Sequence, residues 1–128
     1  MSYKEYTVKV YENGSKEWFL NGKRHREDGP AYESANGTKH WFLNGTLHRE
    51  DGPAIEYDDG SKEWFLNGNL HREDGPAIEW ANGTKKWFLS GIKYTEAEFL
   101  KKTQTKEYTV ADLEKLLGHP VKIVKNGY

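Results

Sequence analysis

The chain has 128 residues, a length that suits a single domain with a modest core. Its formal net charge of -1 at pH 7 gives it no overall attraction to nucleic acid or to an anionic membrane, and the absence of cysteine excludes disulfides, thiolate metal ligands and cysteine nucleophiles. Aromatic residues reach 14% although hydrophobic residues make up only 35%, which favours thin sheets held together by large flat side chains.

The N-terminal stretch, MSYKEYTVKVYENG, has no apolar core of the kind that signal peptides carry. No segment of the sequence approaches the roughly 20 consecutive apolar residues that a membrane-spanning helix needs. Loose alternation from Tyr3 to Tyr11 predicts an entry strand. We therefore expect a cytoplasmic protein in which residues 1–17 form an N-terminal strand and cap.

A repeat of fixed length follows this entry strand. The triplet Trp-Phe-Leu starts at Trp18, Trp41, Trp64 and Trp87, so each copy begins 23 residues after the one before. Every unit carries an Asn-Gly or Asp-Gly step ahead of the triplet and a second turn signal directly after it, which is Asn-Gly in three units and Ser90-Gly91 in the fourth. Asn-Gly between short β-prone segments is a strong signal for a β-hairpin. The sequence therefore predicts repeated hairpins.

The turn that follows each triplet fixes one strand pairing. A two-residue turn at Asn67-Gly68 sets Phe65 opposite Leu70 and Trp64 opposite His71. Directly opposed residues share a face of a sheet, so Phe65 and Leu70 point to one side while Trp64 and His71 point to the other.

The turn ahead of each triplet allows two pairings. A three-residue loop that ends at Gly60 sets Glu56 opposite Lys62, whereas a two-residue loop sets Glu56 opposite Glu63, which is a repulsive pair. We favour the three-residue loop for this reason. It places Ile55 on the face that carries Phe65.

Together these turns predict a mainly β fold. We expect 23-residue β-hairpin repeats stacked as a meander, a small solenoid in which each unit buries its apolar face against the next. The repeats occupy residues 18–94 of a β-hairpin repeat domain that spans residues 1–94. Tyr94 takes the position that His71 holds one unit earlier, which marks the end of the repeats.

Residues 95–128 predict a small α+β C-terminal cap. Thr95 and Glu98 form a capping-box pattern, which indicates a short helix from there to about Lys102. Residues 121–124 are typical of a last strand. We expect this cap to cover the open edge of the final repeat, because an uncovered edge invites pairing with other chains.

A second helix is predicted between these two elements. It starts at residues 109–112 and is ended by Gly118 and Pro120. Its apolar side chains recur with helical spacing, and they are Val110, Leu113, Leu116 and Leu117.

The heptapeptide His-Arg-Glu-Asp-Gly-Pro-Ala occurs at residues 25–31, 48–54 and 71–77. Histidine and carboxylates bind metals and transfer protons, so an active site is one interpretation. Equivalent residues of stacked hairpins lie roughly 10 Å apart, however, at about 4.8 Å per strand, whereas metal ligands lie about 2 Å from a shared ion. Asp-Gly-Pro is also ordinary turn chemistry. The pattern favours a structural role, and we expect no catalytic residue, metal ligand or cofactor.

Two histidines lie outside this motif. His40 occupies the position that Glu17, Glu63 and Lys86 hold in the other units, which indicates a solvated site. His119 precedes a proline just past a predicted helix end, where it caps the helix or faces water.

The segment DGPAIEYDDGSKEWFLNGNLH resembles the MORN-type repeat, in the variant group where Asp-Gly-Pro and Tyr-x-x-x-Gly alternate with an aromatic-x-Asn-Gly hairpin. This group includes repeat antitoxins, and the resemblance covers about Tyr11 to Tyr94. The form WFLNGxLHREDGPA, ending in Tyr-Thr-Glu-Ala-Glu-Phe, is also similar to small accessory proteins of tailed bacteriophages. The resemblance implies a non-enzymatic module that binds and inhibits a host defence protein or toxin in the host cytoplasm.

Three classes of function stay open at this point. A protein-binding repeat would use Trp and Arg, which are enriched at binding hot spots, although aromatic rows in repeats more often form the core. Its predicted partner-binding residues are Trp41, Trp64, His48, His71, Arg49 and Arg72. Nucleic-acid binding through stacked aromatics is an alternative, but 20 acidic residues outnumber 19 Lys and Arg. The third is a metal-dependent enzyme that uses the His-Arg-Glu-Asp clusters. Either end of the stack could also pair with a second copy of the chain.

Overall fold

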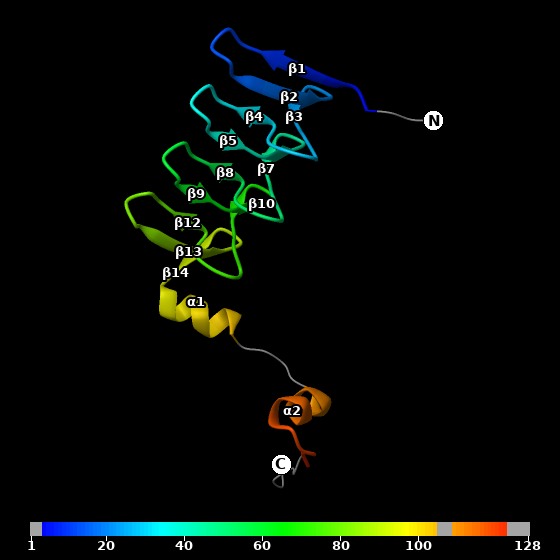
Figure 1. Ribbon diagram of the computed structural model, residues 1–128, viewed down its shortest axis with the longest axis vertical. Coiled ribbons are helices and arrows are strands. Elements are labelled where there is room, and N and C mark those ends of the chain that lie inside the picture. Colours follow the sequence, from blue (N-terminus) through cyan, green and yellow to red (C-terminus); the bar gives the residue numbers. More distant parts are fainter. Residues whose placement is uncertain (1–3, 105–108, 123–128) are drawn as a thin grey trace.

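The computed structural model describes residues 4–104 and 109–122 of the chain. Within these ranges the chain is mainly β, its paired strands are all antiparallel, and two helices follow the last strand (Figure 1). The prediction of a mainly β fold built from hairpins with a helical C-terminal segment is confirmed at this level.

Most of the strands are only two residues long. They are β1 (Tyr6–Val10), β2 (Lys16–Leu20), β3 (Lys23–Arg24), β4 (Tyr32–Glu33), β5 (Lys39–His40), β6 (Phe42–Leu43), β7 (Thr46–Leu47), β8 (Ile55–Glu56), β9 (Lys62–Glu63), β10 (Phe65–Leu66), β11 (Asn69–Leu70), β12 (Ile78–Glu79), β13 (Lys85–Leu89) and β14 (Ile92–Tyr94). The helices are α1 (Glu96–Thr103) and α2 (Val110–Leu117).

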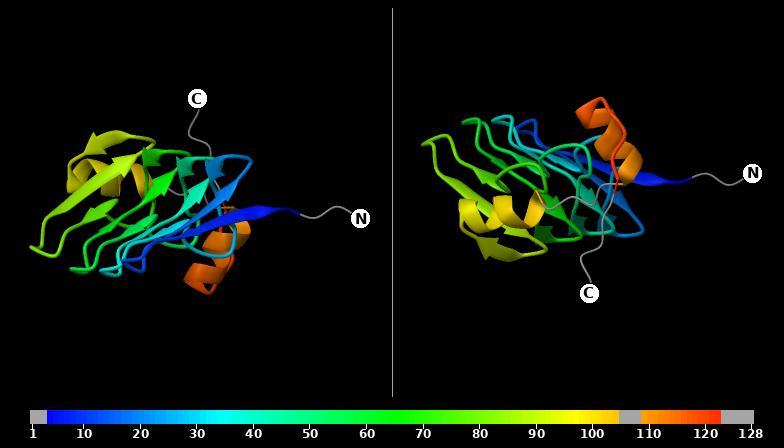
Figure 2. Two further views of the ribbon diagram at one scale, coloured as in Figure 1. Left: turned by 90° about the horizontal axis from the view of Figure 1, so that it is seen from above. Right: turned by 90° about the horizontal axis from the view of Figure 1, so that it is seen from below.

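Each repeat contributes two kinds of hairpin. The wide hairpins, β4–β5, β8–β9 and β12–β13, form the main sheet in the order β1-β2-β4-β5-β8-β9-β12-β13-β14, with β3 beside β2. The narrow hairpins are closed by the turns that follow the triplets, and β6–β7 and β10–β11 form separate two-stranded sheets. Successive units follow one another along the long axis of the molecule, with the wide turns on one side (Figures 1 and 2).

Both predicted registers are confirmed. In the narrow hairpin Phe65 lies opposite Leu70, and the turn residues Asn67 and Gly68 have φ angles of 50° and 80°. Positive φ at both positions matches the twist of the adjoining strands, which is why Asn-Gly suits this turn. In the wide hairpin Glu56 lies opposite Lys62, as the three-residue loop requires.

In each of the two middle units a single residue separates the strand of the wide hairpin from the strand of the narrow hairpin. Trp64 separates β9, in the main sheet, from β10, in its own sheet. Its N–H donates to the Ala77 carbonyl at 2.8 Å and its carbonyl accepts from the His71 N–H at 3.0 Å, so Trp64 bonds both to its own narrow hairpin and to the residue before β12. Ile55 pairs with Glu63, two residues before Phe65, while Phe65 pairs within its own small sheet, so their predicted shared face stays a prediction.

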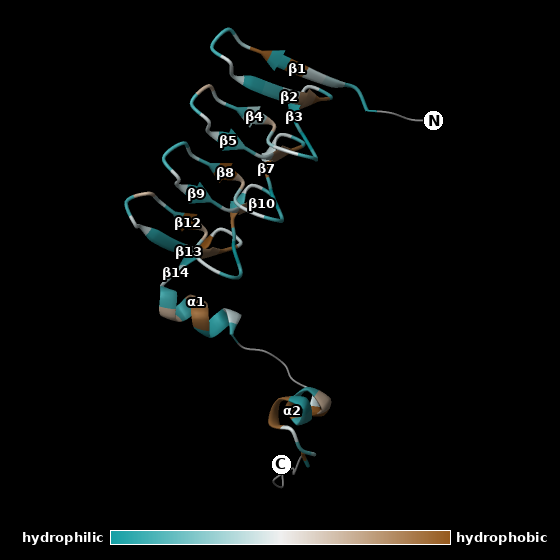
Figure 3. Ribbon diagram, in the orientation of Figure 1, coloured by the Kyte–Doolittle hydropathy of each residue, from teal (hydrophilic) through white to brown (hydrophobic). Residues whose placement is uncertain are grey.

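The core is a narrow line of small and medium side chains that runs through the units. Ala31, Ala54 and Ala77 are fully buried, and Ile55 and Ile78 are buried beside them. Most of the ribbon is hydrophilic, with hydrophobic stretches at β12 and in α1 (Figure 3). So thin a core needs polar contacts between units to hold the stack together.

One set of such contacts joins successive wide turns through hydroxyl groups. In each case the hydroxyl oxygen of one unit accepts a hydrogen bond from a backbone N–H of the next. The bonds are Ala35 N–H to Ser15 Oγ at 3.1 Å, Asp58 N–H to Thr38 Oγ1 at 3.3 Å and Ala81 N–H to Ser61 Oγ at 2.8 Å. Ser15 and Ser61 are buried as a result.

Helix α1 closes the C-terminal end of the main sheet. The predicted capping box is confirmed, since Thr95 Oγ1 accepts from the Glu98 N–H and the Glu98 side chain accepts from the Thr95 N–H. The helix packs on β13 and β14 and buries Phe99, which is 2% exposed. This half of the predicted cap covers the last repeat.

Helix α2 does not share that role. It begins and ends as predicted, with Thr109 as N-cap and Gly118 in the left-handed conformation at φ 77°. It lies beyond α1 (Figure 1), and none of its residues is buried, with Leu116 76% exposed. Residues 121–122 form no strand, and residues 123–124 of the predicted last strand lie outside the described residues.

His40 is half-buried, so its predicted solvated position is wrong. Its ring lies edge-on to Tyr32, with 5.3 Å between the ring centroids, and 6.2 Å from the ring of Phe42. Burial and, secondarily, the positive charge of Arg24 lower the pKa of His40 below its ordinary value of 6.5.

Acidification is therefore expected to weaken the fold through His40. The folded state favours the neutral ring, so the stabilisation by His40 is fully present above its ordinary pKa of 6.5. This stabilisation is lost as the pH falls from 6.5 through the lowered pKa that His40 has in the folded state. In His40→Gln the loss of unfolding free energy between about pH 8 and about pH 5 should be smaller than in the wild type. Urea unfolding at both pH values measures it, and equal losses in the two proteins would contradict the expectation.

Candidate functional site

The three copies of the heptapeptide form the connections from the narrow hairpins back to the main sheet. We call residues 25–31, 48–54 and 71–77 the HRED loops. They lie outside regular strands, and each one starts directly after its narrow hairpin. Their side chains make nearly the same contacts in all three units, so the middle loop is described for all.

The arginine of each HRED loop ties the loop together. The guanidinium carbon of Arg49 lies 3.9 Å from the centroid of the Trp41 ring. Nε donates to Asp51 at 3.0 Å, and Nη1 donates to the Pro53 carbonyl at 3.1 Å and to Glu56 at 3.2 Å. The planar donor fork of arginine suits this set of acceptors, and lysine offers no such fork. The charge of Arg49 is therefore largely used inside its own unit.

The small residues of the loop make room for that arrangement. A Cβ atom on Gly52 would lie 3.0 Å from Cζ of Arg49, so a glycine here lets the guanidinium pass. Ala54 is fully buried. Its N–H donates to the Glu63 backbone carbonyl and its carbonyl accepts from the Trp41 N–H, both at 2.8 Å. These two backbone bonds hold the C-terminal end of the loop in place.

The histidine of each loop links its unit to the next one. Nδ1 of His48 accepts a hydrogen bond from the backbone N–H of Asn67 at 2.9 Å. An accepting nitrogen carries no proton, so this network assigns the ring proton to Nε2, which lies 3.5 Å from Glu50. The same bond joins His25 to Asn44 and His71 to Ser90, at 2.9 and 2.8 Å.

This assignment predicts different outcomes for two substitutions of His48. Asparagine keeps an acceptor near the position of Nδ1, whereas glutamine puts its acceptor near Nε2. His48→Gln should lower the unfolding free energy by about 1 kcal/mol, because the Asn67 N–H loses its partner, and His48→Asn should lose less than half of that. Chemical denaturation followed by circular dichroism measures both. Equal losses would mean that the bond to Nδ1 does not matter.

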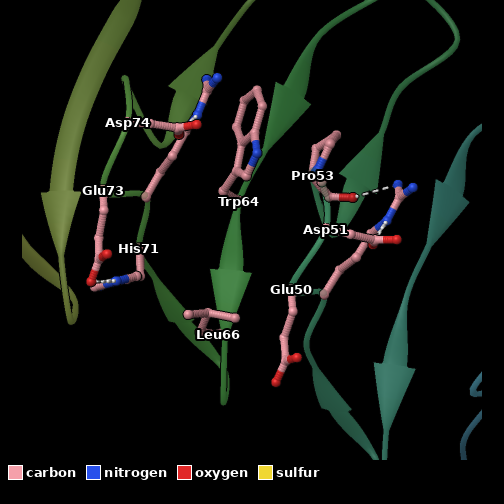
Figure 4. Close-up of a pocket in the computed structure, with 11 residues that line it drawn as sticks. Glu50, Asp51, Pro53, Trp64, Leu66, His71, Glu73 and Asp74 are labelled. Carbon is pink, nitrogen blue, oxygen red and sulfur yellow. Dashed lines mark hydrogen bonds and ion pairs between the residues drawn. The ribbon is translucent and has the colours of Figure 1, made fainter.

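The six predicted partner-binding residues gather along two neighbouring grooves between HRED loops. The groove between the second and third loops has a volume of about 650 Å³ and is lined by Arg49, Trp64, His71 and Arg72. A groove of the same volume between the first and second loops is lined by Trp41, His48 and Arg49. Trp64 and Leu66 lie between the two loops, with Asp51 and Pro53 on one side and Glu73 and Asp74 on the other (Figure 4).

The most exposed charges of these grooves are carboxylates that sequence reasoning left out. The side chains of Asp51 and Asp74 are each 86% exposed, and those of Glu50 and Glu73 are 84% and 79% exposed. The arginine side chains are only 22% exposed. The signal was present in the sequence, because each loop carries two acidic residues and one arginine. We call this row of grooves and carboxylates the HRED face.

Within residues 4–104 and 109–122, no group of three or more His, Asp or Glu side chains is arranged to hold a metal ion. In the same ranges no helix is both long enough and apolar enough to cross a bilayer. No family model, curated protein or solved structure matches this chain. The geometry of the HRED face is thus the basis for assigning a function.

Proposed function

We propose that this chain is a non-enzymatic protein-binding module, a short solenoid of MORN-type repeats that binds its partner along the HRED face. The observation that carries the proposal is the use of the arginine and histidine side chains within the stack. Arg49 is held by four groups of its own unit, and His48 is bonded to Asn67 of the next. Groups bound in this way give a rigid surface, which lowers the ordering cost of binding.

The chemistry of this face favours a positively charged protein surface as partner. Carboxylates at the rim, such as Glu50 and Glu73, attract lysine and arginine side chains and set the specificity of the contact. Half-buried indoles such as that of Trp64, on which the Arg72 guanidinium is stacked, offer apolar contact. The same carboxylates repel phosphates, which argues against the nucleic-acid alternative.

The resemblance to repeat antitoxins and to phage accessory proteins supports a more specific form of this proposal. In that form the partner is a host defence protein or a toxin in the host cytoplasm, and the chain inhibits it by covering a basic surface. Nucleases fit this description, because enzymes that act on nucleic acids present basic grooves to the phosphate backbone. The proposal requires neither a cofactor nor a metal.

The test compares two charge reversals of equal size. Glu50→Lys changes the HRED face, and Asp58→Lys changes an exposed acidic residue of a wide turn. The tagged wild-type chain and both variants are used to capture proteins from a lysate of a bacterial host. We expect a partner that wild type and Asp58→Lys retain and that Glu50→Lys binds at least about tenfold more weakly.

Titration calorimetry with the captured protein completes the test. The dissociation constant should rise with salt, because the contact relies on exposed charges. A captured protein that binds Glu50→Lys as tightly as Asp58→Lys would rule out the HRED face. The absence of any protein that distinguishes the two variants would contradict the proposal as a whole.

A further inference from the structure

The two ends of the main sheet are finished differently. At the C-terminal end α1 packs on β13 and β14 and buries Phe99. At the other end β1 pairs with β2 along one side, and no other described element lies beyond it (Figures 1 and 2). The strand β1 is therefore a five-residue open edge, whereas the last repeat is covered.

The backbone groups that face this open edge follow from the pairing with β2. Tyr11 N–H donates to the Ser15 carbonyl at 2.9 Å, so Tyr11 bonds toward β2. Bonding positions alternate along an antiparallel strand, which makes Lys9 and Thr7 the next inward-bonding residues. The N–H and C=O groups of the even-numbered residues of β1, from Tyr6 to Val10, consequently point outward.

The side chains of these even-numbered residues are apolar and exposed. Tyr6 is 37%, Val8 45% and Val10 66% exposed, and alternation puts all three on one face of the strand. Proteins usually protect an edge with charges, proline or a bulge. The one charged residue within β1 is Lys9, whose Nζ lies 4.8 Å from the centroid of the Phe19 ring.

We propose that β1 pairs with β1 of a second copy of this chain, antiparallel and around a twofold axis at Val8. In this register Val8 faces Val8 of the second copy, and Tyr6 faces Val10 of the second copy. All outward N–H and C=O groups of the strand then meet complementary groups. Beyond the strand ends, Lys4, whose Nζ donates to Glu27 of its own copy, comes opposite Glu12 of the second copy, which would give this lysine a second carboxylate at both ends of the contact.

Neighbouring twofold registers fit less well. An axis at Lys9 puts the lysines of the two copies directly opposite each other. An axis at Thr7 places Val10 opposite Lys4 and leaves part of the outward row of β1 without a strand residue to pair with. The Val8 axis therefore combines the longest hydrogen-bonded overlap with favourable charges.

This pairing would also join the HRED faces of the two copies. Val8 lies opposite Trp18 in the β1–β2 pair, and both side chains line a groove of about 380 Å³ beside the first HRED loop. A twofold axis perpendicular to the sheet leaves this face on the same side in both copies. The dimer would present two rows of grooves to one partner.

Disulfide trapping tests the register directly, because the chain has no cysteine of its own. Opposed residues of a hydrogen-bonded pair have Cα atoms about 5.5 Å apart, which a disulfide can bridge. Val8→Cys should therefore form a covalent dimer under mild oxidation. Thr7→Cys is the matched control. In the Val8 register each Thr7 lies opposite Lys9 of the other copy, so the two cysteines do not face each other and should react at least about tenfold more slowly. A Thr7→Cys dimer that forms as fast as the Val8→Cys dimer would overturn the proposal.

Sedimentation equilibrium of the full chain supplies an independent test. Val8→Pro removes an outward N–H and no hydrogen bond to β2, so it should leave the far-ultraviolet spectrum intact while weakening the dimer at least about tenfold. Glu12→Lys should also weaken it, because it sets a lysine opposite Lys4 of the second copy. A wild-type chain that stays monomeric at millimolar concentration, or a Glu12→Lys variant that dimerises as tightly as wild type, would show that the proposal is wrong.

Discussion

Arg49→Ala is expected to lower the free energy of unfolding by about 3 kcal/mol. The ion pair with Asp51 contributes little of this, since that carboxylate is 86% exposed and exposed pairs are worth under about 1 kcal/mol. The larger share comes from the stacking of the guanidinium on Trp41 at 3.9 Å and from its bonds to the Pro53 carbonyl and Glu56. Urea unfolding followed by tryptophan fluorescence and circular dichroism measures the loss.

Two further variants decide whether the geometry or the charge of Arg49 matters. Arg49→Lys keeps the charge but not the planar fork, so it should recover less than half of the lost stability. Lys39→Ala removes an exposed cation from a wide hairpin and should change stability by no more than about 0.5 kcal/mol. Full recovery in Arg49→Lys would show that the bonds to Pro53 and Glu56 are not needed.

The parts of the fold that sequence reasoning predicted correctly are those that neighbouring residues control. The turn at Asn67-Gly68 needs two positive φ angles, and few residue pairs other than Asn-Gly accept them. The pairing of Glu56 with Lys62 follows from the choice between attraction and repulsion across one loop. Helix α1 likewise begins where Thr95 and Glu98 can cap it.

Contacts between units could not be predicted in the same way. A period of 23 residues says that each unit is alike, but not which atoms of one unit touch the next. His48 shows the difference: its backbone pairing with Trp41 follows from the hairpin, while its ring is bonded to Asn67, 19 residues away. The bond from the Trp64 N–H to the Ala77 carbonyl escaped prediction for the same reason, because Ala77 lies beyond the narrow hairpin.

The candidate site was predicted in part for a related reason. Periodic spacing brings residues such as Trp64 and Arg72 to one side of the stack, and they do line a common groove. Residue type alone could not show that Arg72 is committed to Trp64, at 3.8 Å, and to Asp74. Exposure depends on these internal contacts, so the sequence signal of two acidic residues and one arginine per loop did not by itself show that the carboxylates are the accessible charges. Binding by any of these residues stays a prediction.

Gly68→Val is expected to be the most damaging single substitution in the narrow hairpins, at about 3 to 4 kcal/mol. Gly68 has a φ of 80°, which a β-branched residue resists. Its N–H donates to the Leu47 carbonyl of the preceding unit at 2.8 Å, and an added Cβ would lie 3.0 Å from Cγ2 of Thr46. The side chain would therefore push two units apart as well as strain the turn.

A comparison with Gly60 separates these two effects. Gly60 has a φ of 91°, but nothing lies within 4 Å of an added Cβ, so Gly60→Val should cost only the backbone strain of about 1 to 2 kcal/mol. A second comparison combines Gly68→Ala with Thr46→Ser. The serine lacks the methyl group of Thr46 that the Cβ of an alanine at position 68 would contact. If the contact between units matters, Gly68→Ala combined with Thr46→Ser should be more stable than the sum of the single changes allows. Two results would contradict this expectation: an equal loss of unfolding free energy in Gly60→Val and Gly68→Val, and additive effects of Gly68→Ala and Thr46→Ser. Together they would mean that the contact between Gly68 and Thr46 does not help to hold the repeats in register.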